Sequence, residues 1–164
     1  MKYTKYLFLD VDGVLNHRDW YKNLNGNDLS YPFRDFDTSC VERVNDILEE
    51  TGARLVLISN WRLDANIKDI LYSVGLPSIF DCTPYVPGKP RGYEIIKYFE
   101  EHDIDWKNTN YVIIDDCNDF SKCQQKHFIQ TAYEPFEISL YKQNGGCGLT
   151  DACARRAIKI LNNM

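Results

Sequence analysis

The chain has 164 residues, of which 44% are hydrophobic and 26% are charged, and its formal net charge is −5. This composition is typical of a globular protein and excludes disordered, collagen-like and coiled-coil chains. The acidic balance argues against an extended surface for duplex nucleic acid, which needs clustered Lys and Arg. No apolar run is long enough for a membrane span or for the core of a signal peptide. We therefore expect one cytoplasmic domain over residues 1–164, monomeric by default and without membrane contact.

The cysteines allow a prediction about redox chemistry. Six are present, at positions 40, 82, 117, 123, 147 and 153, and none forms a C-x-x-C pair. The ligand spacing typical of structural zinc is therefore missing. We expect reduced and mostly buried thiols.

The first third of the chain alternates strand and helix patterns. Residues 6–11 begin with an apolar run that ends at Asp10, which is typical of a buried strand in a parallel sheet. Apolar residues at helical spacing follow over 41–48, with candidate N-caps at 37–39 and Gly52 just beyond the end. A second buried strand is predicted at 54–59.

The rest of the chain continues this alternation. Helical patterns are predicted at 63–74, 93–99 and 154–161. Strands are predicted at 78–80, 111–115 and 127–131. The pattern predicts an α/β fold, a three-layer Rossmann-like parallel sheet with helices on both faces. Two stretches fit neither pattern, and we expect a small flap at 16–36 and a loop at 132–149.

Polar residues follow the three strongest strands. They are Asp10 and Asp12 after the first, Ser59, Asn60 and Arg62 after the second, and Asp115 and Asp116 at the end of the third. Ligands of an open parallel sheet bind outside the carboxyl ends of its strands, so these side chains are expected to meet. Four carboxylates in one cleft repel one another unless a cation lies among them. Ligands that are all oxygen favour Mg²⁺.

Each of these features also has a purely structural explanation. Asp-Gly after a strand is often only a turn, and a Ser or Asn at a strand end often caps the following helix. Their joint placement at three strand ends favours a site. Neither a calcium loop nor a P-loop fits, because the glycine and lysine positions that those motifs require are missing.

The motifs resemble those of the haloacid dehalogenase (HAD) superfamily of phosphohydrolases. Residues 10–16, Asp-Val-Asp-Gly-Val-Leu-Asn, resemble its first motif. Ser59 is similar to the second motif and residues 113–116 to the fourth. The third motif is a Lys or Arg near the start of a helix, and both Lys89 and Arg91 qualify.

The sequence around these motifs most resembles that of the small, uncapped HAD domains associated with RNA-repair proteins. The segments that carry this likeness are 8–16, 59–62, 91–95 and 148–150, so the resemblance extends over nearly the whole chain. Asn60 departs from it, because a small Ser or Thr is more usual at that position.

The resemblance implies a set of chemical roles. Asp10 would be the nucleophile that forms an aspartyl-phosphate, and Asp12 would be the general acid and base. Mg²⁺ would be held by Asp10, by the Asp12 carbonyl and by Asp115, with Asp116 supporting it through water.

The phosphate ligands implied by the resemblance are less narrowly defined. Ser59 and Asn60 would hold phosphoryl oxygens together with the third-motif cation, which is either Lys89 or Arg91. Arg62 either contacts substrate or pairs with an acidic neighbour.

The substrate is constrained by the length of the intervening segments. Only about 30 residues separate Ser59 from Lys89, which leaves no room for a large cap. An open site suits a phosphorylated nucleic-acid end or a nucleotide, ahead of a small metabolite. Trp20 in the flap either stacks on a base or packs the flap onto the core. The alternative class is a catalytically quiet phosphate-binding or interaction domain.

Overall fold

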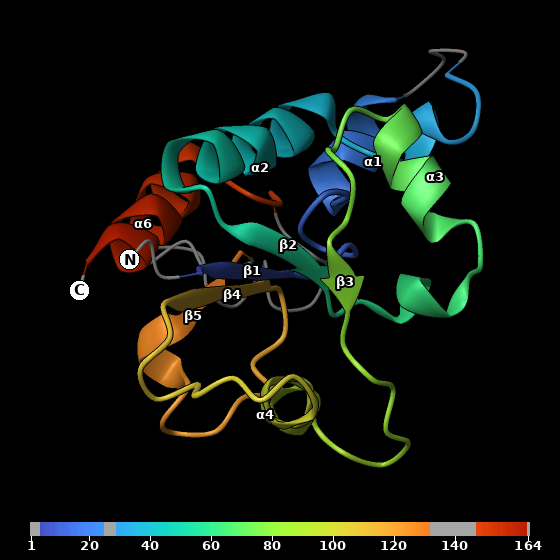
Figure 1. Cartoon of the computed structure of the whole chain (residues 1–164). Coiled ribbons are helices and arrows are strands. Elements are labelled where there is room, and N and C mark those ends of the chain that lie inside the picture. Colours follow the sequence, from blue (N-terminus) through green and yellow to red (C-terminus); the bar gives the residue numbers. More distant parts are fainter. Residues whose placement is uncertain (1–3, 25–28, 132–146, 164) are drawn as a thin grey trace.

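The computed structural model describes residues 4–24, 29–131 and 147–163. Its centre is a five-stranded parallel sheet in the order β3-β2-β1-β4-β5 (Figure 1). The strands are β1 (Tyr6–Leu9), β2 (Arg54–Leu57), β3 (Asp81–Cys82), β4 (Tyr111–Asp115) and β5 (Phe128–Gln130). Leu9 pairs with Leu57 and with Ile114, so β1 and its two neighbours end at the same edge of the sheet.

Helices cover both faces of the sheet. The α-helices are α1 (Arg18–Asn23), α2 (Thr38–Thr51), α3 (Ile67–Ser73), α4 (Arg91–Glu101) and α6 (Asp151–Asn162), and the 3-10 helices are η1 (Phe33–Asp35), η2 (Asn60–Leu63) and η3 (Gln125–His127). Helices α2, α3 and α6 lie on one face and α4 lies on the other (Figure 1). This arrangement confirms the predicted three-layer α/β fold.

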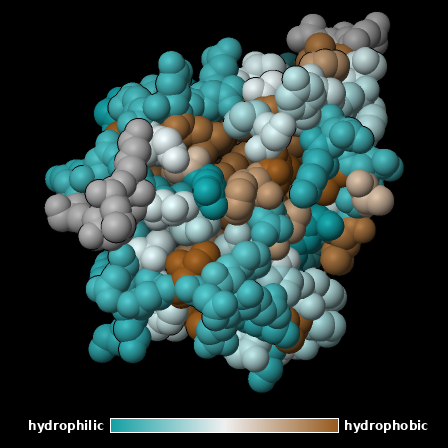
Figure 2. Space-filling model, viewed as in Figure 1, coloured by the Kyte–Doolittle hydropathy of each residue, from teal (hydrophilic) through white to brown (hydrophobic). Residues whose placement is uncertain are grey.

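Alternation along each strand divides the core into two parts. Leu7 and Leu9 face the α2 and α6 side, whereas Tyr6 and Phe8 face α4. Successive side chains of a strand point to opposite faces, so a strand buried on both sides must be apolar throughout. Hydrophilic side chains cover most of the outer surface, and hydrophobic ones gather near the centre of the face in Figure 2, between α2 and the β3 edge.

Helix α2 begins and ends where the sequence predicts. The Asp37 carboxylate accepts a hydrogen bond from the Ser39 N–H at 2.9 Å and so caps the first turn, and Gly52 follows the last residue. Helix α6 is capped in the same way by Thr150, whose hydroxyl accepts from the Cys153 N–H at 3.2 Å.

Two expectations about local structure are wrong. The third strand lies at Asp81–Cys82 and not at 78–80, because the Phe80 ring is 48% exposed and lies beneath the Arg54 guanidinium instead of entering the core. Leu63 is 60% exposed and belongs to η2, so α3 begins only at Ile67. The stretch at 16–36, expected as a small flap, contains α1 and η1. Most of the expected loop at 132–149 lies outside the described residues.

The cysteines differ from expectation in burial. No disulfide joins the six cysteines, all of which are among the described residues. Only Cys40 is buried, and Cys117 and Cys123 are exposed, so the expectation of mostly buried thiols is wrong. Within the described ranges, no helix is long and apolar enough to cross a membrane.

Candidate active site

The site begins with Asp10, the residue that follows β1. Its backbone N–H continues the ladder to β4 by donating to the Ile114 carbonyl at 3.0 Å. Its side chain is only 2% exposed. One carboxylate oxygen, Oδ2, lies 2.8 Å from Nη1 of Arg91. The other, Oδ1, is buried without a hydrogen-bond partner among the described residues, which is costly for a charged oxygen.

The loop after Asp10 is a tight turn stabilised by its own side chains. The Leu15 N–H donates to the Val11 carbonyl at 2.8 Å. Asn16 accepts from the Gly13 N–H at 3.0 Å through Oδ1 and donates through Nδ2 to Oδ1 of Asp12 at 2.8 Å. The Asp12 carboxylate therefore has a fixed position although its residue is exposed.

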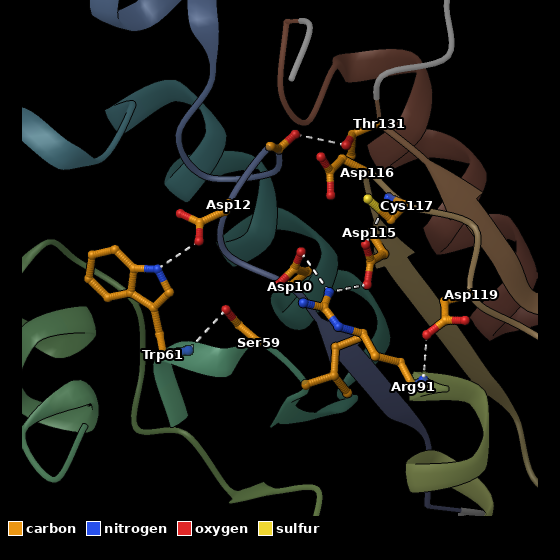
Figure 3. A network of polar contacts seen from close by, with 12 residues as sticks. Asp10, Asp12, Ser59, Trp61, Arg91, Asp115, Asp116, Cys117, Asp119 and Thr131 are labelled. Atoms are coloured by element: carbon orange, nitrogen blue, oxygen red, sulfur yellow. Dashed lines mark hydrogen bonds and ion pairs between the residues drawn. The ribbon is translucent and has the colours of Figure 1, made fainter. Parts of the chain in front are cut away.

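Gly13 brings this turn against the end of β4. Its φ is +77°, a left-handed conformation that favours glycine. A Cβ at this position would lie 2.5 Å from the carboxyl group of Asp116, closer than nonbonded atoms approach. The Gly13 carbonyl also accepts from the Thr131 hydroxyl at 2.8 Å (Figure 3). Only glycine lets Asp116 lie beside the first motif.

The end of β4 adds two carboxylates. Asp115 is fully buried, and its Oδ1 accepts from the Cys117 N–H at 2.9 Å. Asp116 is half-buried. Ligand atoms of Asp115, Asp116 and Cys117 all lie within 4.8 Å of one another. Asp115 and Asp116 thus lie together, and register places Asp115 at the same sheet edge as Asp10.

Arg91, the first residue of α4, supplies the cation. Its Nη1 lies 2.8 Å from Oδ2 of Asp10 and 2.5 Å from Oδ2 of Asp115, and so bridges the ends of β1 and β4 (Figure 3). Its backbone N–H donates to Asp119 at 2.9 Å, which fixes the start of the helix. Lys89, the other candidate, is exposed and lies over the Tyr93 ring at 5.4 Å.

The charges of this cluster do not balance. Burial, followed by the charge of Asp10, raises the pKa of Asp115 to about 8. The same two causes raise the pKa of Asp116. Burial acts to lower the pKa of Arg91, but the charges of Asp115 and Asp10 outweigh it and raise that pKa. One guanidinium faces three carboxylates.

The donor set fits Mg²⁺. Carboxylates at two adjacent strand ends supply oxygen ligands, and one of their oxygens, Oδ1 of Asp10, is buried and unpartnered. A hard divalent cation prefers such ligands, and its charge would offset the burial and the repulsion by Asp10 that raise the pKa of Asp115. The Cys117 thiol in the same group is not a preferred Mg²⁺ ligand.

The segment after β2 carries three of the predicted site residues, and one of them, Arg62, is held in an ion pair. Ser59 is buried, and its hydroxyl accepts from the Trp61 N–H at 3.3 Å. Asn60 is exposed. Arg62 is 3% exposed and pairs with Oε2 of Glu94 at 2.7 Å, which is the second of its two predicted alternatives. It also donates to the Ile58 carbonyl.

The flap is tied together by Trp20 and His17. The Trp20 indole N–H donates to the Arg34 carbonyl at 2.9 Å and so joins α1 to η1. His17 accepts from the Trp20 backbone N–H at 3.2 Å and contacts Asp37 at 2.7 Å. Trp20 remains half-buried, so packing within the flap leaves part of its side chain accessible.

The segment before α6 supports the first-motif loop from behind. The Leu149 N–H donates to the Val14 carbonyl at 2.9 Å. Gly148 has a φ of +68°, and a Cβ there would lie 2.5 Å from the His17 ring. Residues 148–149 therefore pack directly against the loop that carries Asp12.

Sequence reasoning missed four contributors: Asn16, Trp61, Asp119 and Thr131. Asn16 and Trp61 lie within the motif segments, but the sequence alone does not indicate that both side chains contact Asp12. The indole N–H of Trp61 donates to Oδ2 of Asp12 at 3.0 Å. Asp119 and Thr131 lie in no motif and act through backbone groups of Arg91 and Gly13, as described above.

A parallel sheet with carboxylates at two adjacent strand ends and an arginine between them defines a HAD-type domain. The chain matches the family described as the HAD domain in Swiss Army Knife RNA repair proteins over residues 6–135, and it belongs to that family. This confirms the predicted resemblance and supports a phosphohydrolase in general. Searches of curated proteins and of solved structures found no match to the chain.

Proposed function

We propose that this protein is a Mg²⁺-dependent phosphatase that hydrolyses a phosphomonoester through an aspartyl-phosphate on Asp10. The observation that carries the proposal is the state of that carboxylate. It is buried at a strand end with Oδ1 unpartnered, while Oδ2 is held by Arg91. An oxygen kept in this condition is costly for stability and suited to attack on phosphorus.

The reaction follows from the placement of Asp10 and Asp12. Oδ1 of Asp10 attacks phosphorus, an O–P bond forms, and the ester P–O bond breaks. The Asp12 carboxyl group gives its proton to the leaving oxygen. Asp12 then takes a proton from water as that water attacks phosphorus, which releases phosphate and restores the Asp10 carboxylate.

Arg91 and Ser59 support binding of the phosphoryl oxygens. The Arg91 fork reaches both strand ends, while Lys89 lies over Tyr93, so we assign the third-motif role to Arg91. The Ser59 hydroxyl already accepts one hydrogen bond and still has its own proton to donate. Asn60 adjoins it and is exposed.

Asp10, Asp115, Asp116 and the Asp12 carbonyl would hold Mg²⁺. When bound, the ion supplies positive charge that compensates the approach of an anionic phosphate to Asp10. Arg91 alone leaves that cluster negative.

For the substrate, we propose a phosphorylated nucleic-acid end or a nucleotide. The family description names RNA repair, and residues 60–90 hold only η2, α3, β3 and connecting segments, with no inserted cap. The flap adds exposed aromatic side chains suited to stacking, namely Tyr21, Tyr31 and Phe33, which are 44%, 57% and 44% exposed.

Hydrolysis of p-nitrophenyl phosphate by the purified chain, with Mg²⁺ and with a chelator, tests the reaction. We expect turnover only with the metal. A second panel compares a 5′- or 3′-phosphorylated oligonucleotide and a nucleotide with a hexose phosphate, and we expect higher kcat/KM for the first two. Equal or better rates on the hexose phosphate would leave a general small-metabolite phosphatase, and absence of any turnover would leave a phosphate-binding domain.

The aromatic flap has its own control. Trp20→Ala should reduce the advantage of the oligonucleotide and leave p-nitrophenyl phosphate turnover unchanged. If Trp20 serves only to join α1 to η1, both activities should fall together with the unfolding temperature.

A further inference from the structure

Two N–H donors from different elements hold the carboxylate of Asp12. Nδ2 of Asn16 donates to Oδ1 at 2.8 Å. Nε1 of Trp61 donates to Oδ2 at 3.0 Å (Figure 3). Asn16 comes from the turn after β1, and Trp61 comes from η2 after β2. Each oxygen of an exposed carboxylate is therefore occupied by a protein donor.

The donors themselves are fixed. Asn16 is buried, and its second amide atom accepts from Gly13. The backbone N–H of Trp61 is held by the Ser59 hydroxyl, and its ring packs against Phe36 with centroids 5.4 Å apart and planes at 65°. Phe36 is 1% exposed. The indole is thus anchored in the core while its N–H points to the site.

We propose that Trp61 is a positioning residue that fixes the plane of the Asp12 carboxyl group for proton transfer. This inference rests on the proposed function. A free exposed carboxylate rotates about its last bond, and holding both oxygens removes that freedom before the substrate arrives. Trp61 thereby links the Ser59 turn, which supports the phosphate, to the group that serves the leaving oxygen.

The two hydrogen bonds from Asn16 and Trp61 still allow Asp12 to donate and accept a proton. Each carboxylate oxygen has two lone-pair sites, and one N–H bond occupies only one of them. The remaining site carries the proton that passes to the leaving oxygen in the first step and accepts one from water in the second. The indole N–H keeps its own proton throughout.

The leaving group of the substrate provides the sharpest test. An alkoxide needs a proton from Asp12, whereas p-nitrophenolate leaves without one. Trp61→Phe keeps an aromatic ring against Phe36 and removes the N–H donor. We expect kcat/KM for glycerol 2-phosphate to fall about tenfold, part of what a general acid contributes, and that for p-nitrophenyl phosphate to fall less than about twofold.

The matched control is Trp106→Phe. Trp106 is half-buried against the core on the α4 side, so this variant loses an indole N–H without touching the loop of Asp12. It should leave both esters unaffected. Equal losses on the two esters in Trp61→Phe, with a lower unfolding temperature, would show a packing role and overturn the proposal, as would no loss on either.

A readout independent of activity uses the indole resonances. The chain has three tryptophans, so ¹⁵N-labelled protein gives three indole N–H signals, and Trp61→Phe identifies the relevant one. Asp12→Ala should move that signal strongly and leave the signals of Trp20 and Trp106 in place. An unmoved signal would overturn the hydrogen bond. Wild-type protein inactive on both esters would instead overturn the proposed function, while the signal still reports the contact.

Discussion

Two arginines near the same edge of the sheet are used in opposite ways. Arg62 and Glu94 form a one-to-one ion pair with side chains 3% and 4% exposed, and the second oxygen of Glu94 accepts from the Val86 N–H at 2.8 Å. Arg91 is 23% exposed and is shared between Asp10 and Asp115. The first pair is balanced and closed, and the second is short of positive charge and open to a ligand.

This difference distinguishes a structural ion pair, Arg62 with Glu94, from a cluster suited to binding a ligand, Arg91 with Asp10 and Asp115. An intact buried pair with matched charges adds little to the stability of the fold. Removal of one partner is costly, because it leaves an uncompensated buried charge. A cluster with excess negative charge and an orphaned oxygen is a liability unless a ligand completes it. Each region contains one buried polar atom without a hydrogen-bond partner, Nε of Arg62 in the first and Oδ1 of Asp10 in the second. Charge balance, not the presence of an arginine, therefore distinguishes the two regions.

The largest expected effect is on the open cluster. Asp10→Asn should lower turnover at least about a thousandfold, because the amide is not a nucleophile. Its unfolding temperature should stay equal or rise, since one repelling charge is removed. Steady-state assays and thermal unfolding check both parts. Asp46→Asn, on the exposed side of α2, is the charge-matched control, and near-normal turnover in Asp10→Asn would refute the mechanism.

The closed pair should respond in the reverse manner. Glu94→Gln keeps the shape and the acceptor for Val86 but leaves the Arg62 charge buried without an opposite charge beside it. We expect the free energy of unfolding to fall by about 3 kcal/mol. Denaturant unfolding measures the loss. A stability equal to wild type would contradict the assignment of this pair as structural.

Mg²⁺ binding at the cluster of Asp10, Asp115 and Asp116 should raise the free energy of unfolding. At a Mg²⁺ concentration about 100 times its Kd, the wild type should gain about 2.7 kcal/mol, because the ion binds only the folded state. Asp115→Ala should lose most of this gain and Asp116→Ala less. Thermal unfolding across a Mg²⁺ titration reports it without any activity assay, and an unchanged titration for Asp115→Ala would refute its role as a ligand.

The smallest effect concerns pH at the flap. Burial acts to raise the pKa of Asp37, but hydrogen bonds from His17 and Ser39 outweigh it and hold that pKa below its ordinary value. A carboxyl whose pKa is lowered by folding stabilises the protein above its unfolded pKa, and this stability is lost as pH falls below about 4. Asp37 is partly exposed, so we expect under about 1 kcal/mol. Asp37→Asn should flatten stability between pH 5 and 3 relative to wild type, and an unchanged slope would contradict the contribution.

The sequence predicted the central sheet well for a physical reason. Strands buried on both faces must be apolar throughout, so β1, β2 and β4 are visible as runs, and Asp10 and Asp115 stand out because they end them. Edge strands escape this rule. Strand β3 has only two residues, both half-buried, and its neighbour Phe80 finds a cation on the surface instead of the core.

Contacts between side chains from different elements could not be predicted from the sequence. Arg62 and Arg91 look equally suited to phosphate, and only the position of Glu94 shows that the first is neutralised. Lys89 and Arg91 are two residues apart, and the direction of the first turn of α4 decides which one reaches Asp10. The bond from Trp61 to Asp12 depends in the same way on how η2 leaves the sheet.

The Leu149–Val14 hydrogen bond has a practical consequence for defining domain boundaries. The family match ends at residue 135, whereas Gly148 and Leu149 pack against the loop that carries Asp12. A chain trimmed to the matched range would keep every carboxylate of the candidate site and lose the support beneath Asp12, together with α6, which packs on α2. The smallest unit that preserves the site is therefore longer than the unit by which the family is recognised.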